Sequence, residues 1–170
     1  MAMRKTRKIK HDPCVAMAER VRQLKKSGKE VVVAVFNDPK VKGAVLFLQV
    51  GVGVQVEAHI WDLPSGKHGF HVHEFGSLLE GCASLGAHWN PTGRDHGGLH
   101  GSERHMGDFG NITKGMKMRF KISPANVGDL LGRSVVIHEG EDDLGKGDKV
   151  DSKTTGGSGA RIGCAVIGLA

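Results

Sequence analysis

The sequence has no run of about 18 apolar residues, the length that a helix needs to cross a membrane, and this absence excludes an integral membrane protein with helical spans. No apolar stretch follows the basic start MAMRKTRKIK, so a secretion signal is not expected and we predict a cytoplasmic location. Cysteine is scarce, and three cysteines leave at least one thiol unpaired within a monomer. A stable disulfide in the cytosol would need a special reason.

Tyrosine is absent, and the body of the chain shows no strong helical pattern, whereas glycine (26 residues) and histidine (10 residues) are abundant. Glycine without a collagen period is typical of a chain rich in turns and favours an all-β fold. A length of 170 residues fits one domain and suffices to bury a core, so neither a metal nor a disulfide is needed merely for folding.

Positive charge is concentrated at one end of the chain. Residues 1–30 contain ten Lys or Arg and three acidic residues, whereas the other 140 residues contain 14 and 15, so the body is close to neutral. We therefore divide the chain into a basic, flexible extension (1–29) and a domain (30–170). A basic arm indicates contact with nucleic acid or another anionic surface, or a nuclear or particle-associated location. A solvated terminus without a partner is an equally good interpretation.

Alternation of apolar and polar residues predicts eight strands in the domain. In the segment 51–61 one face is apolar throughout, and its members are Val52, Val54, Val56, Ala58 and Ile60. The other strands are expected at 30–37, 43–50, 69–73, 108–113, 117–122, 134–138 and 161–169. This pattern favours an antiparallel barrel or sandwich. Two long segments, 74–107 and 139–160, interrupt it, and we interpret them as functional loops.

Histidines of the domain form a pattern typical of metal ligands. His71 and His73 lie two residues apart on an expected strand, so their rings point to the same side. Five further candidates follow along the chain: His88, His96, His105, Asp108 and His138. Six histidines and one aspartate would satisfy two metal ions if one ligand were shared. A nitrogen-rich set suits Cu(II), and three histidines with one aspartate suit Zn(II), but spacing alone leaves the metal open.

Five blocks of sequence, in the same order, resemble the copper/zinc superoxide dismutase family. They are GFHVHEFG (69–76), GCASLGAHWNPTGRDHGG (81–98), ERHMGDFGN (103–111), VVIHEGEDDLGKG (135–147) and GGSGARIGCAVIG (156–168). The resemblance covers about residues 30–170 and implies an eight-stranded Greek-key β-barrel. It also implies an enzyme that converts superoxide to dioxygen and hydrogen peroxide, with one copper and one zinc per subunit.

The resemblance further assigns the metal ligands. The copper ligands implied are His71, His73, His88 and His138. The zinc ligands implied are His88, His96, His105 and Asp108, so His88 is shared as a bridging imidazolate. Asp142 matches a carboxylate that joins the two metal sites, and His68 matches a residue that braces the copper site by hydrogen bonding.

Other roles are implied in the same way. Cys82 and Cys164 match an intrasubunit disulfide, which supplies the special reason for a disulfide inside the cell, and Cys14 is expected to be free. The catalytic residues implied are His88, which passes on a proton, and Arg161, which attracts and orients the superoxide anion. The three remaining histidines, expected at the solvent-exposed surface, are His11, His59 and His100.

The family resemblance also suggests partners. A homodimer is expected through a patch near 75–78 and 166–169, and a copper chaperone is an expected partner for metal loading. The alternative function is that of a non-catalytic, superoxide-dismutase-like domain that binds copper or acts as a chaperone. The presence of all four copper positions and of Arg161 disfavours this alternative.

Overall fold

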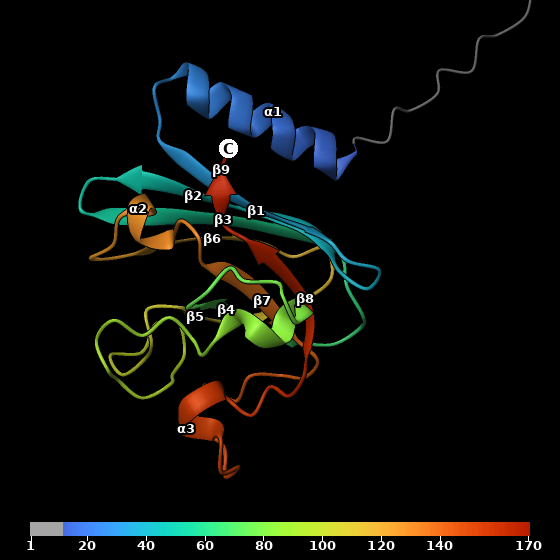
Figure 1. Cartoon of the computed structure of the whole chain (residues 1–170), viewed down its shortest axis with the longest axis vertical. Helices are drawn as coiled ribbons and strands as arrows, with labels where there is room; N and C mark the ends of the chain where they lie inside the picture. Colours follow the sequence, from blue (N-terminus) through green and yellow to red (C-terminus); the bar gives the residue numbers. More distant parts are fainter. Residues whose placement is uncertain (1–11) are drawn as a thin grey trace, which may run out of the picture.

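The computed structural model describes residues 12–170, which form two antiparallel β-sheets packed face to face (Figure 1). The five-stranded sheet has the order β6-β3-β2-β1-β9, and the four-stranded sheet has the order β5-β4-β7-β8. The strands are β1 (Val31–Asn37), β2 (Lys42–Val50), β3 (Gly53–Asp62), β4 (His68–His73), β5 (Asp108–Ile112), β6 (Lys117–Ile122), β7 (Ser134–His138), β8 (Arg161–Val166) and β9 (Gly168–Leu169). The expected all-β fold is confirmed.

One helix precedes the first strand, and short helical segments interrupt the connections between later strands. They are α1 (Pro13–Lys26), the 3₁₀ helix η1 (Gly81–Leu85), α2 (Val127–Leu130) and α3 (Ser152–Thr155). None of the helices within residues 12–170 is both long and apolar enough to cross a lipid bilayer.

The core lies between the two sheets because alternate residues of most strands are apolar. On β3, Val54 and Ile60 are fully buried, as the period-two pattern predicts. Phe70 of β4 packs edge-on against Phe109 of β5, with ring centroids 5.5 Å apart. The prediction was wrong for Val52, which is 77% exposed, because the chain turns at Gly51 and the strand begins only at residue 53.

The last predicted strand, 161–169, divides into two. β8 pairs with β7 in one sheet, and β9 pairs with β1 in the other. Ile167 lies between them, buried, with its amide donating to the carbonyl of Arg133 and its carbonyl accepting from the amide of Gly132. These lateral hydrogen bonds let the chain pass from one sheet to the other, which an apolar run in the sequence does not reveal.

Part of the extension is ordered against the domain. α1 lies along the outer face of the five-stranded sheet (Figure 1), and its Leu24 is buried against Val31, Leu46 and Leu48. The side chain of Asp12 caps the helix by accepting from the amide of Cys14. The sequence predicted a flexible arm over 1–29, whereas residues 13–26 form this helix. Residues 1–11 of the arm, which include His11, lie outside the described part of the chain.

Candidate metal centre

Strand β4 supplies the first two histidines of the site. All six of its residues are buried, because Phe70 and Val72 face the core while His71 and His73 face the other side, beneath the long segment 74–107. The expected strand geometry therefore holds: two imidazoles two residues apart emerge from one side of the sheet.

Four histidines form a first cluster, in which one possible ligand atom from each lies within 4.8 Å of the others: His71, His73, His88 and His138. The outer nitrogens of two rings are held by carbonyls, since His73 Nδ1 donates to Gly86 O at 3.0 Å and His138 Nδ1 donates to Gly159 O at 3.0 Å. Their inner Nε2 atoms face each other at 3.4 Å. A carbonyl can only accept, so these contacts leave both inner nitrogens with a free lone pair.

A second cluster surrounds one oxygen of a buried carboxylate. Asp108 Oδ1 lies 2.8 Å from His88 Nδ1, 3.0 Å from His96 Nδ1 and 3.2 Å from His105 Nδ1. At this end, possible ligand atoms of His71, His88, His96 and Asp108 lie within 4.8 Å of one another, and His105 contacts this group through Asp108. His88 belongs to both clusters, with Nδ1 facing Asp108 and Nε2 directed away from it.

Three imidazole nitrogens in these clusters are buried and make no hydrogen bond among the described residues: His71 Nδ1, His88 Nε2 and His96 Nδ1, whose 3.0 Å contact with Asp108 Oδ1 lacks hydrogen-bond geometry. Leaving a buried polar atom unpaired is costly, so several such atoms converging on two points indicate missing partners. Cations would fill this role. A cluster of four imidazole nitrogens fits copper, and three imidazoles with one carboxylate fit zinc.

Asp142 connects the two clusters. Its Oδ2 accepts from His71 Nε2 at 2.9 Å, and its Oδ1 accepts from His96 Nε2 at 2.8 Å. Burial alone would raise the pKa of Asp142, but the hydrogen bonds from His71 and His96 outweigh it and hold the pKa well below its usual range. The carboxylate is therefore ionised and fixes the outer nitrogen of one ring in each cluster, so that the inner nitrogens face inward.

Burial sets the protonation state of the first cluster. It lowers the pKa of His71 to about 3, that of His73 to about 2 and that of His138 to about 4. These rings are neutral at physiological pH, which is the form in which imidazole binds a metal. His96 differs: burial lowers its pKa, but Asp108 and Asp142 together raise it to about 9. A metal ion must displace that proton.

His68 supports the first cluster from the strand beside it. Its ring is buried, and Nδ1 lies 2.8 Å from the carbonyl of His138, while Nε2 lies 3.2 Å from the carbonyl of Pro64. The contact fixes the backbone at His138. Of the histidines without an assigned role, His100 is exposed, whereas His59 is half-buried, contrary to the prediction.

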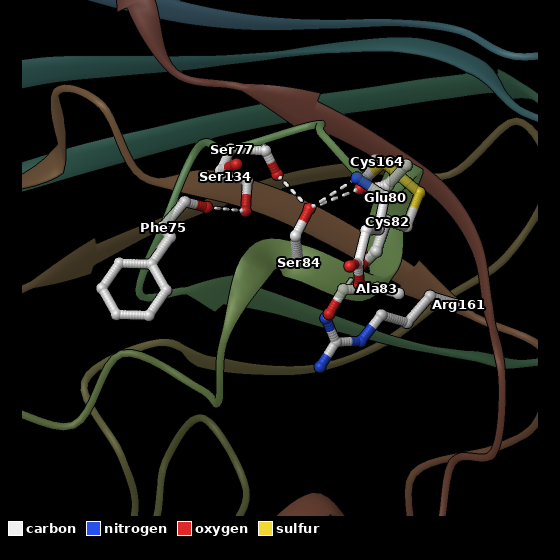
Figure 2. Close-up of a disulfide and its surroundings, with 10 residues drawn as sticks. Phe75, Ser77, Glu80, Cys82, Ala83, Ser84, Ser134, Arg161 and Cys164 are labelled. Carbon is white, nitrogen blue, oxygen red and sulfur yellow. Dashed lines mark hydrogen bonds between the residues drawn. A yellow bond between two sulfur atoms is a disulfide. The ribbon is translucent and has the colours of Figure 1, made fainter.

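Arg161 stands opposite His138 in the β7–β8 register. Its guanidinium donates to the carbonyls of Cys82 at 2.7 Å and Gly86 at 2.6 Å, and it reaches Ala83 as well (Figure 2). The positive charge also lowers the pKa of His73 and His138, after the larger effect of burial. The arginine is therefore close enough to act on the first cluster electrostatically.

The expected disulfide is present and joins Cys82 of η1 to Cys164 of β8 (Figure 2), while Cys14 is free and exposed. It closes a segment of 82 residues and ties the loop that carries His88 to the barrel. The hydroxyl of Ser84 donates to the carbonyl of Ser77, and that of Ser134 to the carbonyl of Phe75. This part of the loop therefore has a fixed path beside Arg161.

Sequence reasoning missed two supports of the site. Asn111 brackets Asp142, because its amide donates to the carbonyl of Asp142 and its oxygen accepts from the Asp142 amide, both at 2.8 Å. The carbonyl of Gly86 holds His73 and Arg161. Asn111 closes the block ERHMGDFGN and could have been noticed there, but a backbone acceptor has no mark in the sequence.

Known proteins with these features were found in three comparisons. The family model for copper/zinc superoxide dismutase matches residues 41–167. An extracellular Cu–Zn superoxide dismutase of Drosophila melanogaster is 45% identical over 142 residues, which are 78% of this chain and 78% of the relative. A crystal structure of the clock protein EA4 superposes with a TM-score of 0.74 at 39% identity, over 84% of this chain and 96% of that one.

Proposed function

Because this chain belongs to the copper/zinc superoxide dismutase family, we propose that it dismutes superoxide at the two joined clusters. In this proposal the first cluster holds copper and the second holds zinc. The copper ligands are His71, His73, His88 and His138. The zinc ligands are His88, His96, His105 and Asp108. When bound, copper supplies one-electron redox chemistry, and zinc supplies a fixed positive charge without redox chemistry of its own.

His88 is the residue that can hold or release a proton between the clusters. Its Nδ1 is hydrogen-bonded to Asp108 Oδ1 at 2.8 Å, and burial lowers the pKa of His88. Its Nε2 is the buried, unpartnered atom. A proton that enters the site therefore binds at His88 Nε2 and leaves from there. Asp108 keeps the ring oriented during the exchange.

Arg161 is proposed to attract and orient the substrate. Superoxide is a small anion, and the guanidinium is held by carbonyls that leave its charge uncompensated by any carboxylate among its hydrogen-bond partners. Burial lowers its pKa, but an arginine remains charged at neutral pH. A fixed cation beside the ligands raises the local concentration of an anion.

The long loops exclude water from the reaction. All ligands in the two clusters are buried, although β4 and β7 would otherwise present them to solvent on the outer face of their sheet. Low solvent access strengthens the attraction between Arg161 and an anion. The loops expected from the sequence therefore serve as the walls of the site.

The observation that carries the proposal is the pair of links between the clusters, the ring of His88 and the carboxylate of Asp142. The test is metal content together with activity. The purified chain is expected to bind one copper and one zinc and to remove superoxide in a cyanide-sensitive manner, and His138→Ala should lose the copper and the activity but keep the fold. Zinc in both sites without activity would support the non-catalytic copper-binding or chaperone alternative instead.

A homodimer is part of this proposal. Phe75, Leu78 and Leu169 are exposed apolar side chains at the two segments where the patch is expected, and contiguous apolar surface is typical of an interface. Sedimentation at several concentrations tests it. The cytoplasmic location stays a prediction, and the extracellular Drosophila relative is an argument against it. The copper chaperone also stays a prediction.

A further inference from the structure

The outer face of the five-stranded sheet changes character from one edge to the other. On β1 and β2 its outward residues are apolar, and on β6 they are basic. The strand register gives three rows across the sheet: Val35–Ala44–His59–Lys117, Val33–Leu46–Glu57–Arg119 and Val31–Leu48–Gln55–Lys121. The helix α1 covers the apolar half, while the basic half stays open to solvent.

A groove of about 460 Å³ lies between α1 and the basic half of the sheet. Arg20 of α1 forms one wall, and Lys117 and Arg119 of β6 form the other. The acid in the groove is Glu57, which accepts two hydrogen bonds from Arg20 at 3.0 and 3.1 Å and lies 3.7 Å from Arg119 Nε. The groove therefore carries three cations against one carboxylate, which is already paired with Arg20, and Lys121 follows on the same strand outside the groove lining.

The cations of β6 form a regular row. Lys117, Arg119 and Lys121 are exposed and occupy alternate positions of one strand, so their Cα atoms are about 6.8 Å apart. That interval is comparable with the distance between successive phosphates of an extended single strand. A row of cations in a groove tracks such a backbone.

An aromatic pair adjoins the row. His59 lines the groove directly beside Lys117, and its ring contacts Trp61 edge-on, with centroids 5.6 Å apart. Burial and the neighbouring Lys117 lower the pKa of His59, so the ring is neutral and can stack on a base. Stacking needs an unpaired base, because the bases of a duplex already stack on one another. The ring of His59 therefore favours a single strand over a duplex.

We infer that the groove between α1 and β6 binds single-stranded nucleic acid, with phosphates along Lys117, Arg119 and Lys121 and a base on His59. The sequence located an excess of positive charge only in the extension, whereas the fold joins part of that extension to a basic strand of the domain. Binding at this face is independent of the metal centre, since the groove lies against the five-stranded sheet, whereas strands β4, β5 and β7 of the four-stranded sheet carry metal ligands (Figure 1).

Lysines on an edge strand also have a simpler use, which is to prevent the edge from pairing with other chains. β6 is an edge strand of its sheet, so this use must be distinguished from binding. Protection of an edge requires charge alone. It requires neither the ring of His59 nor the wall formed by α1.

The test is binding of a fluorescein-labelled oligothymidylate of about 20 nucleotides to the metal-loaded full chain at several salt concentrations. The triple variant Lys117→Gln, Arg119→Gln, Lys121→Gln removes the row and should weaken binding about tenfold or more. The plot of the logarithm of the association constant against log salt should also become less steep, its negative slope decreasing in magnitude by about 2. The matched control neutralises three exposed lysines of the loops near the metal centre, Lys67→Gln, Lys146→Gln and Lys153→Gln, and should leave the slope unchanged. Because Arg119 also lies near Glu57, its replacement could destabilise the fold. The double variant Lys117→Gln, Lys121→Gln replaces the triple variant in the binding test if the triple variant is unstable.

Replacement of the ring separates stacking from charge. His59→Ala should lower affinity about fivefold or more without changing the salt slope, and His59→Phe should restore it. Four results would overturn the inference: no binding at low salt, equal affinity for a duplex of the same sequence, stronger binding to a sulfated polysaccharide or to anionic vesicles, or a row variant that binds as well as the wild type. A row variant that only aggregates, with unchanged binding by its soluble fraction, would assign β6 to edge protection.

Discussion

The ring of His73 and the guanidinium of Arg161 donate to the same acceptor, the carbonyl of Gly86, at 3.0 and 2.6 Å. One backbone atom thus positions a proposed metal ligand and the proposed guide for the substrate. Gly86 has φ +74°, and a Cβ at this position would lie 2.7 Å from the ring of Phe75 and 2.8 Å from Glu74 Oε2. The site therefore requires glycine here.

Gly86→Ala is expected to displace the shared carbonyl and to disturb both donors at once. We expect a loss of superoxide removal of about tenfold or more, because small displacements of reacting groups have large effects on rate. The measurement is kcat/KM at several ionic strengths. Gly93→Ala is the matched control, since Gly93 also has a positive φ (+64°) but open space around it. Equal losses in the two variants would show that backbone strain, rather than the shared carbonyl, is responsible.

Asp142→Asn should loosen both clusters without removing a ligand. The amide can no longer accept from both His71 and His96 as an ionised carboxylate does, so metal affinity is expected to fall about 10–100-fold. Competition with a chelator measures this loss for each metal. Asp148→Asn, an exposed aspartate of the same loop, should retain both metals. Unchanged retention in Asp142→Asn would contradict the linking role.

Opening the disulfide should affect stability and substrate guidance together. Cys82→Ser with Cys164→Ser removes a link that closes a long segment, and the free energy of unfolding should fall by about 2–4 kcal/mol. Because Arg161 donates to the carbonyl of Cys82, the salt dependence of the rate should weaken as well. Cys14→Ser, at the exposed thiol, should change neither property. Thermal unfolding of the metal-loaded chains provides the comparison.

Docking of α1 is expected to depend on pH through Glu57. The hydrogen bond from Arg20 lowers the pKa of Glu57, and Arg119 lowers it further, against the effect of burial. The pKa of this group is lower in the docked state than its ordinary value of about 4.3. Its contribution is therefore fully present above that value and is lost as the pH falls towards the lowered pKa.

A bimane label on Cys14 reports this docking, because Cys14 and Trp61 line the same groove beside α1 and tryptophan quenches the label. Quenching should be strong at neutral pH and should decrease below a pH of about 4. In Glu57→Gln, quenching should be weaker at neutral pH and should vary less with acidification. A pH profile identical to that of the wild type would rule out Glu57 as the group responsible.

The strands and the common side of His71 and His73 were predictable because their signals are local, whereas the assignment of the full ligand sets rests on the family resemblance. Alternating residues, such as those of β3, directly reflect one buried face, and the spacing of His71 and His73 fixes their common side. The packing of α1 was not predictable, since it depends on Leu24 and Arg20 meeting residues of β2 and β3 that are distant in sequence. The same holds for the sheet crossing at Ile167 and for the carbonyl of Gly86.

The central claim is that one imidazole, that of His88, lies between two different metal ions. Anomalous diffraction from crystals of the loaded, oxidised protein, recorded at the copper and zinc absorption edges, tests it directly. The account predicts a copper peak on the Nε2 side of His88, among His71, His73 and His138, and a zinc peak on the Nδ1 side beside Asp108. A single peak, or two peaks with the ring of His88 turned away from either, would contradict it.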